Sequence, residues 1–258
     1  MATVQHAGEL LREWRLRRNL SQFDLAARSA ISARHLSFVE TGRARASREM
    51  LLHLAQRLEV PLRDRNRLLV AAGFAPVFAQ RPLDDDALAL ARTAVERFLA
   101  AHAPYPALAI DRAWNIVAAN DSIAWLTEDV APELLEPPAN ALRATLHPQG
   151  MAPRIVNFDE WSGHLLDRLR RELELTASAE LQTLYDEVSG YPNVRIEPQE
   201  SDAASEVLLP LRLRLGEREL AFFSTVTTFG TARDVTLEEL SIEAFYPADD
   251  VTAAALRG

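Results

Sequence analysis

One segment constrains this chain more than any other: residues 21–43, with the sequence SQFDLAARSAISARHLSFVETGR. The pattern predicts two short helices joined by a tight turn, because Ser21 and Ser32 can each cap the free backbone N–H groups of a following helix. Gly42 supplies the left-handed residue at which the second helix ends. A short helix braced by another, with Ser and Arg side chains near its N-terminal end, has the geometry that reads a DNA major groove.

This segment resembles the Xre/Cro-type helix-turn-helix, whose pattern is Ser/Thr-Gln-x-x-Leu-Ala, then Ile/Val-Ser, then Glu-x-Gly-Arg. The pattern is filled in register here, with one departure. Ala30 occupies a turn position often filled by Gly, and alanine fits there if the backbone stays right-handed. Helical patterns over residues 8–18, 48–58 and 63–72 complete the five helices that the resemblance implies.

Charge divides the chain unevenly. Residues 1–81 contain 14 arginines and seven acidic residues, whereas the other 177 residues contain 14 arginines and 30 acidic residues. A basic N-terminal part followed by an acidic remainder is the charge asymmetry expected when only the N-terminal part contacts DNA phosphates. Double-stranded DNA is therefore the expected partner of the first domain.

Several classes of protein are disfavoured by what the sequence lacks. It contains no run of some 18 apolar residues, no signal segment at its N-terminus and no cysteine, so we expect a cytoplasmic protein without disulfides, Cys-ligated zinc or contact with a membrane. The six histidines are scattered, and neither His-Glu-x-x-His, Gly-x-Ser-x-Gly nor a phosphate-cradling Gly loop occurs. We therefore expect neither an enzyme, nor a metal site, nor a cofactor.

The rest of the chain predicts an α+β organisation. We expect a helix-turn-helix domain over residues 1–80, a linker and connecting helix over 81–103, and a second domain over 104–258. The second domain should contain a hairpin around Asp111, helices, and a three-strand meander with a turn at Gly216. The fold class is thus an all-α five-helix domain followed by an antiparallel sheet with helices on one side. The predicted elements are strands over 107–111, 114–118, 207–215 and 220–227, helices over 84–101, 121–126, 160–174 and 179–188, a turn and strand over 234–245, and a tail helix over 251–257.

This order resembles a PAS-like fold, and the chain is similar to the MmyB-like group of bacterial regulators. The resemblance rests on residues 34–45, 61–66, 71–76, Asp111-Arg112-x-Trp114-Asn115, Ala119-Asn120, His147-Pro148-x-Gly150, residues 154–157 and Trp161. It implies an Xre-type DNA-binding domain followed by a PAS-like ligand-binding domain. It also implies an apolar, fatty-acid-like ligand.

Five residues are candidate base readers. In the Xre-type docking pose Ser32, Ala33 and Arg34 face base edges, with Ser37 and Phe38 one turn further on. Arg34 suits a bidentate contact with guanine, and Phe38 suits a thymine methyl group. The alternative is that Arg34 binds phosphate only.

Three further residues are candidate contacts to the DNA backbone. Gln22 begins the first helix of the motif, and Arg43 and Arg45 follow the second, where phosphate oxygens are the nearer targets. Glu40 is acidic within the DNA-facing helix, so we expect it to pair internally. The resemblance names Arg15 as its partner.

Eight residues of the second domain are candidate ligand contacts: Trp114, Trp125, His147, Arg154, Asn157, Trp161, His164 and Phe223. We expect the aromatic members to line an apolar pocket and a His or Arg to hold the polar end of a ligand. Val117 and the alternating apolar residues of 207–222 should close it, so that tryptophan at Ala118 or Ala221 would fill it. The alternative is ordinary amphipathic packing.

Together these features predict a one-component transcription regulator, whose sequence-specific DNA binding is controlled by a small apolar ligand. A homodimer would place two recognition helices about 34 Å apart, and residues 84–101 would transmit the signal. Two alternatives stay open. One is a constitutive DNA-binding repressor whose C-terminal domain only dimerises, and the other is an antitoxin-like module that binds a protein partner.

Overall fold

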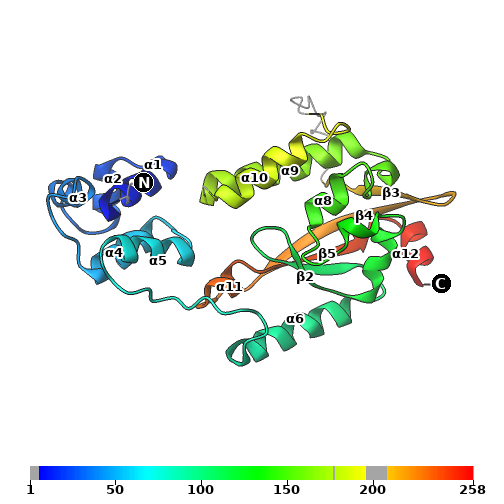
Figure 1. Cartoon of the computed structure of the whole chain (residues 1–258), viewed down its shortest axis with the longest axis horizontal. Helices are drawn as coiled ribbons and strands as arrows, with labels where there is room; N and C mark the ends of the chain where they lie inside the picture. Colours follow the sequence, from blue (N-terminus) through cyan, green and yellow to red (C-terminus); the bar gives the residue numbers. More distant parts are fainter. Residues whose placement is uncertain (1–5, 177, 196–207, 258) are drawn as a thin grey trace. The chain divides into compact units, whose positions relative to one another are not determined.

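A computed structural model describes residues 6–176, 178–195 and 208–257. It forms two compact units, one of Met1–Arg81 with Thr231–Glu238 and the other of Pro82–Gly230 with Glu239–Gly258 (Figure 1). Val207, the first residue of the expected meander, lies outside the described part.

The described part of unit 1 contains the expected five helices in its N-terminal segment. Each helix of the motif begins at its predicted cap, because the Ser21 Oγ accepts from the Asp24 N–H at 3.1 Å and the Ser32 Oγ accepts from the His35 N–H at 3.1 Å. Leu11, Leu25 and Leu36 are fully buried in the core that these helices share. The helices are α1 (Ala7–Arg17), α2 (Gln22–Arg28), α3 (Ala33–Glu40), α4 (Arg48–Arg57) and α5 (Leu62–Ala71).

The turn between α2 and α3 differs from the expectation at one residue. Ala30 has a φ of +53°, so its backbone is left-handed rather than right-handed. A Cβ in this conformation approaches the following carbonyl oxygen, which costs about 1–2 kcal/mol relative to the right-handed form. The geometry of the turn therefore overrides the preference of alanine.

Residues 231–238 lie in the sequence between two segments of unit 2 but pack with unit 1. They include α11 (Val235–Glu238), which is tied to the segment after α5: the Val235 N–H donates to the Ala79 carbonyl at 2.8 Å, and Arg81 pairs with the buried Asp234 at 2.8 Å. The Glu238 carboxylate accepts from the Leu62 N–H at 2.7 Å. Because α5 follows Pro61, which offers no side-chain cap, α11 supplies the cap from a distant part of the chain.

Five strands form one antiparallel sheet in the described part of unit 2, in the order β2-β1-β5-β4-β3. The central strand β5 pairs with β1 through Leu108 and Glu243 and with β4 through Thr225 and Ala244. The strands are β1 (Ala107–Ile110), β2 (Ile116–Ala119), β3 (Leu211–Leu215), β4 (Arg218–Thr228) and β5 (Ser241–Pro247).

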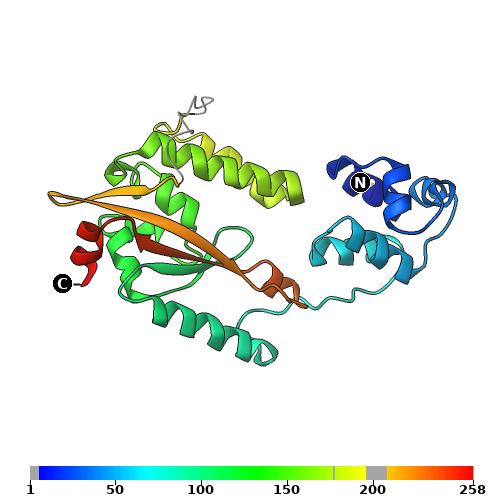
Figure 2. The same cartoon turned by 180° about the vertical axis from the view of Figure 1, so that it is seen from behind.

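Helices cover both faces of this sheet (Figures 1 and 2). The sequence predicts helices on one side of the sheet, and α8, α9 and α10 bury one face in the larger core. Helix α6, expected as a connecting helix, packs Val95 and Leu99 against Ala109 and Ala244 on the opposite face. The α+β class is confirmed. The helices are α6 (Ala89–His102), α7 (Ala124–Thr127), α8 (Ala141–Leu146), α9 (Phe158–Thr176), α10 (Ala179–Ser189) and α12 (Asp250–Arg257), with short 3-10 turns at Asp86–Leu88, Asp121–Ile123, Pro132–Leu134 and Ala152–Arg154.

Candidate DNA interface and ligand pocket

A buried ion pair fixes the second helix of the motif to α1. Arg15 donates from Nε to Glu40 Oε1 at 2.7 Å and from Nη2 to Oε2 at 2.8 Å, with the two side chains only 7% and 1% exposed. The fork-to-fork contact raises the pKa of the Arg15 guanidinium. The expected Arg15–Glu40 pair is therefore present, and it holds α3 in place rather than reading bases.

Gln22 joins this pair instead of pointing only to solvent. Its Nε2 donates to Glu40 Oε2 at 2.8 Å, so the carboxylate receives hydrogen bonds from both α1 and α2. The Gln22 side chain thereby helps to orient α3. Its expected contact with a DNA phosphate remains a prediction.

The five candidate readers follow one another along the start of α3 and its next turn. Ser32 is exposed and caps the helix, Ala33 and Ser37 are half-buried, and Arg34 is exposed. The Arg34 guanidinium carbon lies 5.4 Å from the centroid of the half-buried Phe38 ring. The helix thus presents a cation, an aromatic ring and small polar groups over two turns.

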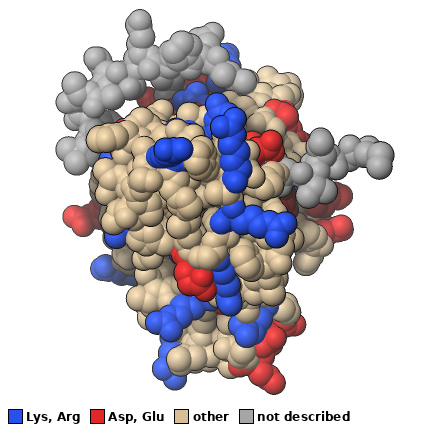
Figure 3. Space-filling model, turned by 90° about the vertical axis from the view of Figure 1, so that its left-hand side faces the viewer, with Lys and Arg blue, Asp and Glu red and all other residues tan. Residues whose placement is uncertain are grey.

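Positive charge is concentrated around this helix. Arg43 and Arg45 are both exposed just after α3, and neither has a salt bridge within the described part of the chain. Figure 3, viewed onto the side that carries α3, shows several arginine side chains spread over the surface. This is the charge distribution that DNA phosphates favour.

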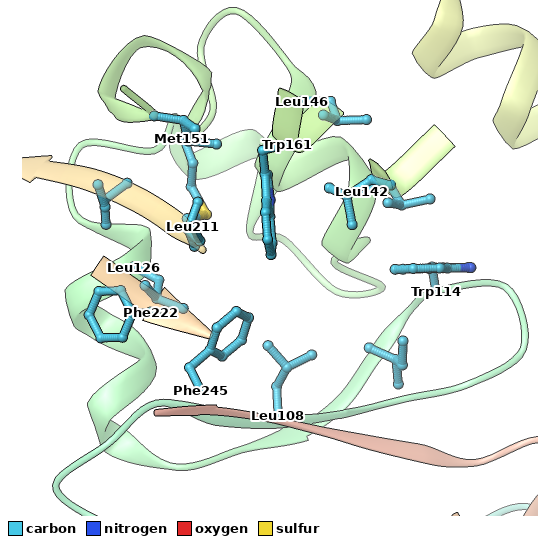
Figure 4. Close-up of a cluster of buried hydrophobic side chains, with 14 of the residues drawn as sticks. Leu108, Trp114, Leu126, Leu142, Leu146, Met151, Trp161, Leu211, Phe222 and Phe245 are labelled. Carbon is cyan, nitrogen blue, oxygen red and sulfur yellow. The ribbon is translucent and has the colours of Figure 1, made fainter. Parts of the chain in front are cut away.

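The second candidate site is a pocket between the sheet and helices α7 to α9. The cavity itself has a volume of about 50 Å³, and the space counted out to its open mouth is about 560 Å³. Figure 4 shows Trp161 and Met151 pointing from the helical side toward Phe245 and Leu108 on the strands. Its lining is almost wholly apolar: Leu108, Trp114, Ile116, Ile123, Leu126, Thr127, Ala141, Leu142, Ala144, Thr145, Met151, Trp161, Leu165, Leu211, Glu243 and Phe245.

Of the eight expected ligand contacts, the structure places Trp114 and Trp161 in this lining. Trp125 is 42% exposed, because the single turn of α7 directs Leu126 to the core instead. Phe223 lies on the other face of β4 from the buried Phe222 and stacks on Tyr246 at 5.2 Å between ring centroids.

The polar candidates serve other contacts outside the lining. Asn157 holds the start of β3, donating to the Pro210 carbonyl at 2.8 Å and accepting from the Arg212 N–H at 3.0 Å. The ring of His147 packs edge-on against Tyr191, and the exposed His164 ring lies 5.6 Å from the ring of the lining residue Trp161, measured between centroids. None of these three residues lines the pocket, and their expected contacts with a ligand remain a prediction.

Arg154 borders the pocket without lining it. Its Nη2 donates to the carbonyl of Leu126, whose side chain is part of the wall, while Nε and Nη1 are buried without a hydrogen-bond partner among the described residues. Burial lowers the pKa of this guanidinium, and the nearby Asp129 and Glu128 oppose that shift.

The expected wall residues also need two corrections. Val117 is 40% exposed, and Ala118 packs with the core on the α6 face, because an irregularity in the β1–β2 register follows Ala109. Ala221 likewise does not line the pocket. Tryptophan at Ala118 or Ala221 would therefore not fill it, whereas Ala141 and Ala144 do face it.

One lining residue, Glu243, is not among those that the sequence pattern singled out. It is 6% exposed, and its Oε1 accepts from Arg168 Nη1 at 3.3 Å. The Arg168 Nε lies 3.4 Å from Glu172 Oε1, and the guanidinium carbon lies 4.3 Å from the Trp114 ring centroid. A signal for Glu243 exists in the alternation of β5, which places residues 243 and 245 on one face.

Comparison with known families gives a match for each of two parts of the chain. Residues 91–258 match the model described as MmyB-like transcription regulator ligand binding domain, and residues 6–68 match the one described as Helix-turn-helix domain. The first match spans more than half of the chain, so the chain belongs to the family of transcription regulators with an MmyB-like ligand-binding domain. A comparison with curated proteins gives no match.

Two observations bear on other classes of site. Among the described residues, no helix combines the length and apolar character needed to cross a membrane. Across the same residues, no group of three or more His, Cys, Asp or Glu side chains is arranged to hold a metal ion.

Proposed function

We propose that this protein is a one-component transcription regulator in which a small apolar ligand, bound in unit 2, controls sequence-specific DNA binding by unit 1. The observation that carries the proposal is the pocket itself. Two buried tryptophans and a ring of aliphatic side chains surround it, in a chain whose other unit presents the exposed Arg34 on a helix-turn-helix.

DNA recognition is assigned to α3 and its flanks. Arg34 reads a guanine, with Ser32, Ala33, Ser37 and Phe38 facing neighbouring base edges. Gln22, Arg43 and Arg45 contact the DNA backbone, where they add affinity without sequence preference. The exposure of Arg34, Arg43 and Arg45 supports this division.

The ligand is an apolar molecule with an aliphatic, fatty-acid-like chain. The lining of the pocket supports this class, because its leucine, isoleucine, methionine and tryptophan side chains offer dispersion contacts and few hydrogen bonds. Trp114 and Trp161 are its aromatic walls.

We assign DNA binding to a homodimer. A two-fold arrangement would present two α3 helices to half-sites about 34 Å apart, which one copy of the chain does not offer.

Control of DNA binding would pass through strands β4 and β5. Phe245 and Glu243 on β5 line the pocket, whereas Thr231–Glu238, which connects β4 to β5, belongs to unit 1. A ligand that shifts these strands therefore acts on a segment that caps α5. Helix α6, which the sequence favours for this role, is part of the sheet core of unit 2.

The decisive test compares operator affinity with and without ligand. A dimer extracted with solvent and then reloaded should change its operator affinity by about 1–3 kcal/mol. Ala144→Leu should fill the pocket and abolish that change, and Ala118→Leu, on the opposite face of the sheet, is its control. Ligand-independent affinity in a folded dimer would favour instead a constitutive repressor whose C-terminal domain dimerises or binds a partner.

The same binding assay distinguishes a residue that contacts a base from a residue that contacts the DNA backbone. Arg34→Ala should lose about 1–3 kcal/mol on the operator and relax preference at one base pair. Arg43→Ala should weaken operator and random DNA alike and reduce the salt dependence by about one phosphate. Equal behaviour of the two variants on both DNAs would contradict the division.

A further inference from the structure

The pocket holds one charged side chain among the described residues of its lining, Glu243. It lies in the middle of β5, opposite Leu108 of β1 and Val226 of β4, and it shares a face with Phe245. Burying a carboxylate in an apolar wall is costly unless partners compensate its charge. The charged and polar groups around Glu243 therefore indicate which kind of ligand head group the pocket can bind.

The partners of Glu243 compensate it only in part. Arg168 contacts Oε1, and no hydrogen-bond donor of the described residues reaches Oε2. Arg168 is also shared with Glu172, whose Oε2 accepts from the Trp114 Nε1 at 2.9 Å. Two carboxylates thus face one guanidinium, and burial raises the pKa of the Glu172 carboxyl.

The hydroxyl groups of the lining are already engaged, whereas the indole N–H of Trp161 makes no hydrogen bond with the described residues. The Thr127 hydroxyl donates to the Ile123 carbonyl at 3.3 Å, and the Thr145 hydroxyl donates to the Ala141 carbonyl at 2.8 Å. Arg154, the cation beside the pocket, is not among the residues that line it. An ionised carboxylate in the pocket would therefore meet a like charge in a medium of low dielectric constant.

We propose that the polar head of the ligand binds at Glu243 as a hydrogen-bond donor, so that the pocket selects an aliphatic molecule ending in a hydroxyl or an amine over one ending in an ionised carboxylate. This inference rests on the proposed ligand-binding function and names the head group that goes with its aliphatic chain. A hydrogen-bond donor on the ligand would give Glu243 Oε2 a partner. A cationic head group would also offset the negative charge of the second carboxylate, that of Glu172.

The test uses decanol, decylamine and decanoic acid, which share one chain and differ in the head. At pH 7.5 the amine is protonated and the acid is ionised. Calorimetry on the full-length protein after solvent extraction should show the alcohol and the amine binding about tenfold or more tighter than the acid. Equal or tighter binding of the acid to the wild-type protein would overturn the proposal.

Two variants locate the selection at Glu243. Glu243→Leu should abolish the preference for a donor, and Glu243→Gln, which keeps an acceptor of the same size, should retain the alcohol and weaken the amine. Glu172→Gln is the matched control, because Glu172 shares Arg168 but does not line the pocket. The preference for the alcohol over the acid should survive in this variant, whereas the amine should lose the part of its advantage that comes from the second carboxylate. A preference that persists in a folded Glu243→Leu protein, or in Glu243→Gln if the leucine variant does not fold, would overturn the proposal.

The outcomes also separate this inference from the function on which it rests. Binding of all three compounds, with the acid tightest and Ala144→Leu blocking each, keeps the pocket and rejects the donor site. If none of the three compounds binds to a folded wild-type protein, the apolar-ligand function fails, and the donor site fails with it.

Discussion

At the scale of single residues, burial separates the charges that hold unit 1 together from the charges that face solvent. Arg15 and Glu40 form a bidentate pair inside the core, and Gln22 adds a third hydrogen bond to the same carboxylate. Arg34 and Arg43 are exposed. Substitutions in the first group should therefore affect folding, and substitutions in the second should affect DNA binding.

Glu40→Ala should lower the free energy of unfolding by about 3–5 kcal/mol, because it leaves the Arg15 guanidinium buried without its partner. Urea unfolding of the full chain measures this change. Glu13→Ala is the control, since its 3.8 Å contact with Arg17 lies at the surface, where ion pairs contribute about 0–1 kcal/mol. Equal unfolding curves for Glu40→Ala and the wild-type protein would show that the pair is not required.

Ala30→Gly should raise the free energy of unfolding by about 0.5–1 kcal/mol. Glycine removes the steric cost of the left-handed turn but adds conformational entropy to the unfolded chain, and the first effect is the larger. Ala27→Gly, exposed within α2, should lower stability by a similar amount. Urea unfolding should therefore give a higher free energy of unfolding for Ala30→Gly than for Ala27→Gly. The opposite order would contradict the prediction.

At the scale of elements, the described start of β3 is held by a side chain that the sequence pattern assigns to the ligand. Asn157→Ala removes two hydrogen bonds to Pro210 and Arg212 and should cost about 1–3 kcal/mol of stability. Amide exchange in β3 should accelerate, whereas decanol affinity should not change. Lost decanol affinity with unchanged exchange would return Asn157 to the ligand site.

How far the elements could be predicted from sequence depends on whether the signal is local. Caps and periodicity located α1 to α5, because Ser21 and Ser32 act within a few residues of their own position. Phe222 and Phe223 are neighbours on β4, so only one of them can point into the core, and the structure buries Phe222. Alternation along a strand predicts which residues share a face, but it does not say which face is the buried one. Proximity between distant segments, such as Glu243 and Arg168, carries no local signal at all.

At the scale of the whole molecule, the chain crosses between its two compact units more than once. It leaves unit 1 near Arg81, returns to it for Thr231–Glu238, and then enters β5 of unit 2. The strands on either side of this segment form the middle of the sheet that bears the pocket. In the proposed function, this connectivity is the covalent route by which a ligand in unit 2 would act on unit 1, and no linear division of the sequence reveals it.

The last prediction tests that route with two adjacent glutamates. Glu238→Ala removes the cap of α5 within unit 1, whereas Glu239→Ala removes a partner of Arg112 within unit 2. Both proteins should bind decanol like the wild-type protein, because neither residue lines the pocket.

Glu238→Ala should lose most of the ligand-induced change in operator affinity, since a coupling of about 1–3 kcal/mol requires differential contacts in the element that transmits it. Glu239→Ala should keep that change. An unaltered response in Glu238→Ala, with α5 shown by amide exchange to be loosened, would reject transmission through α11 and return the role to α6.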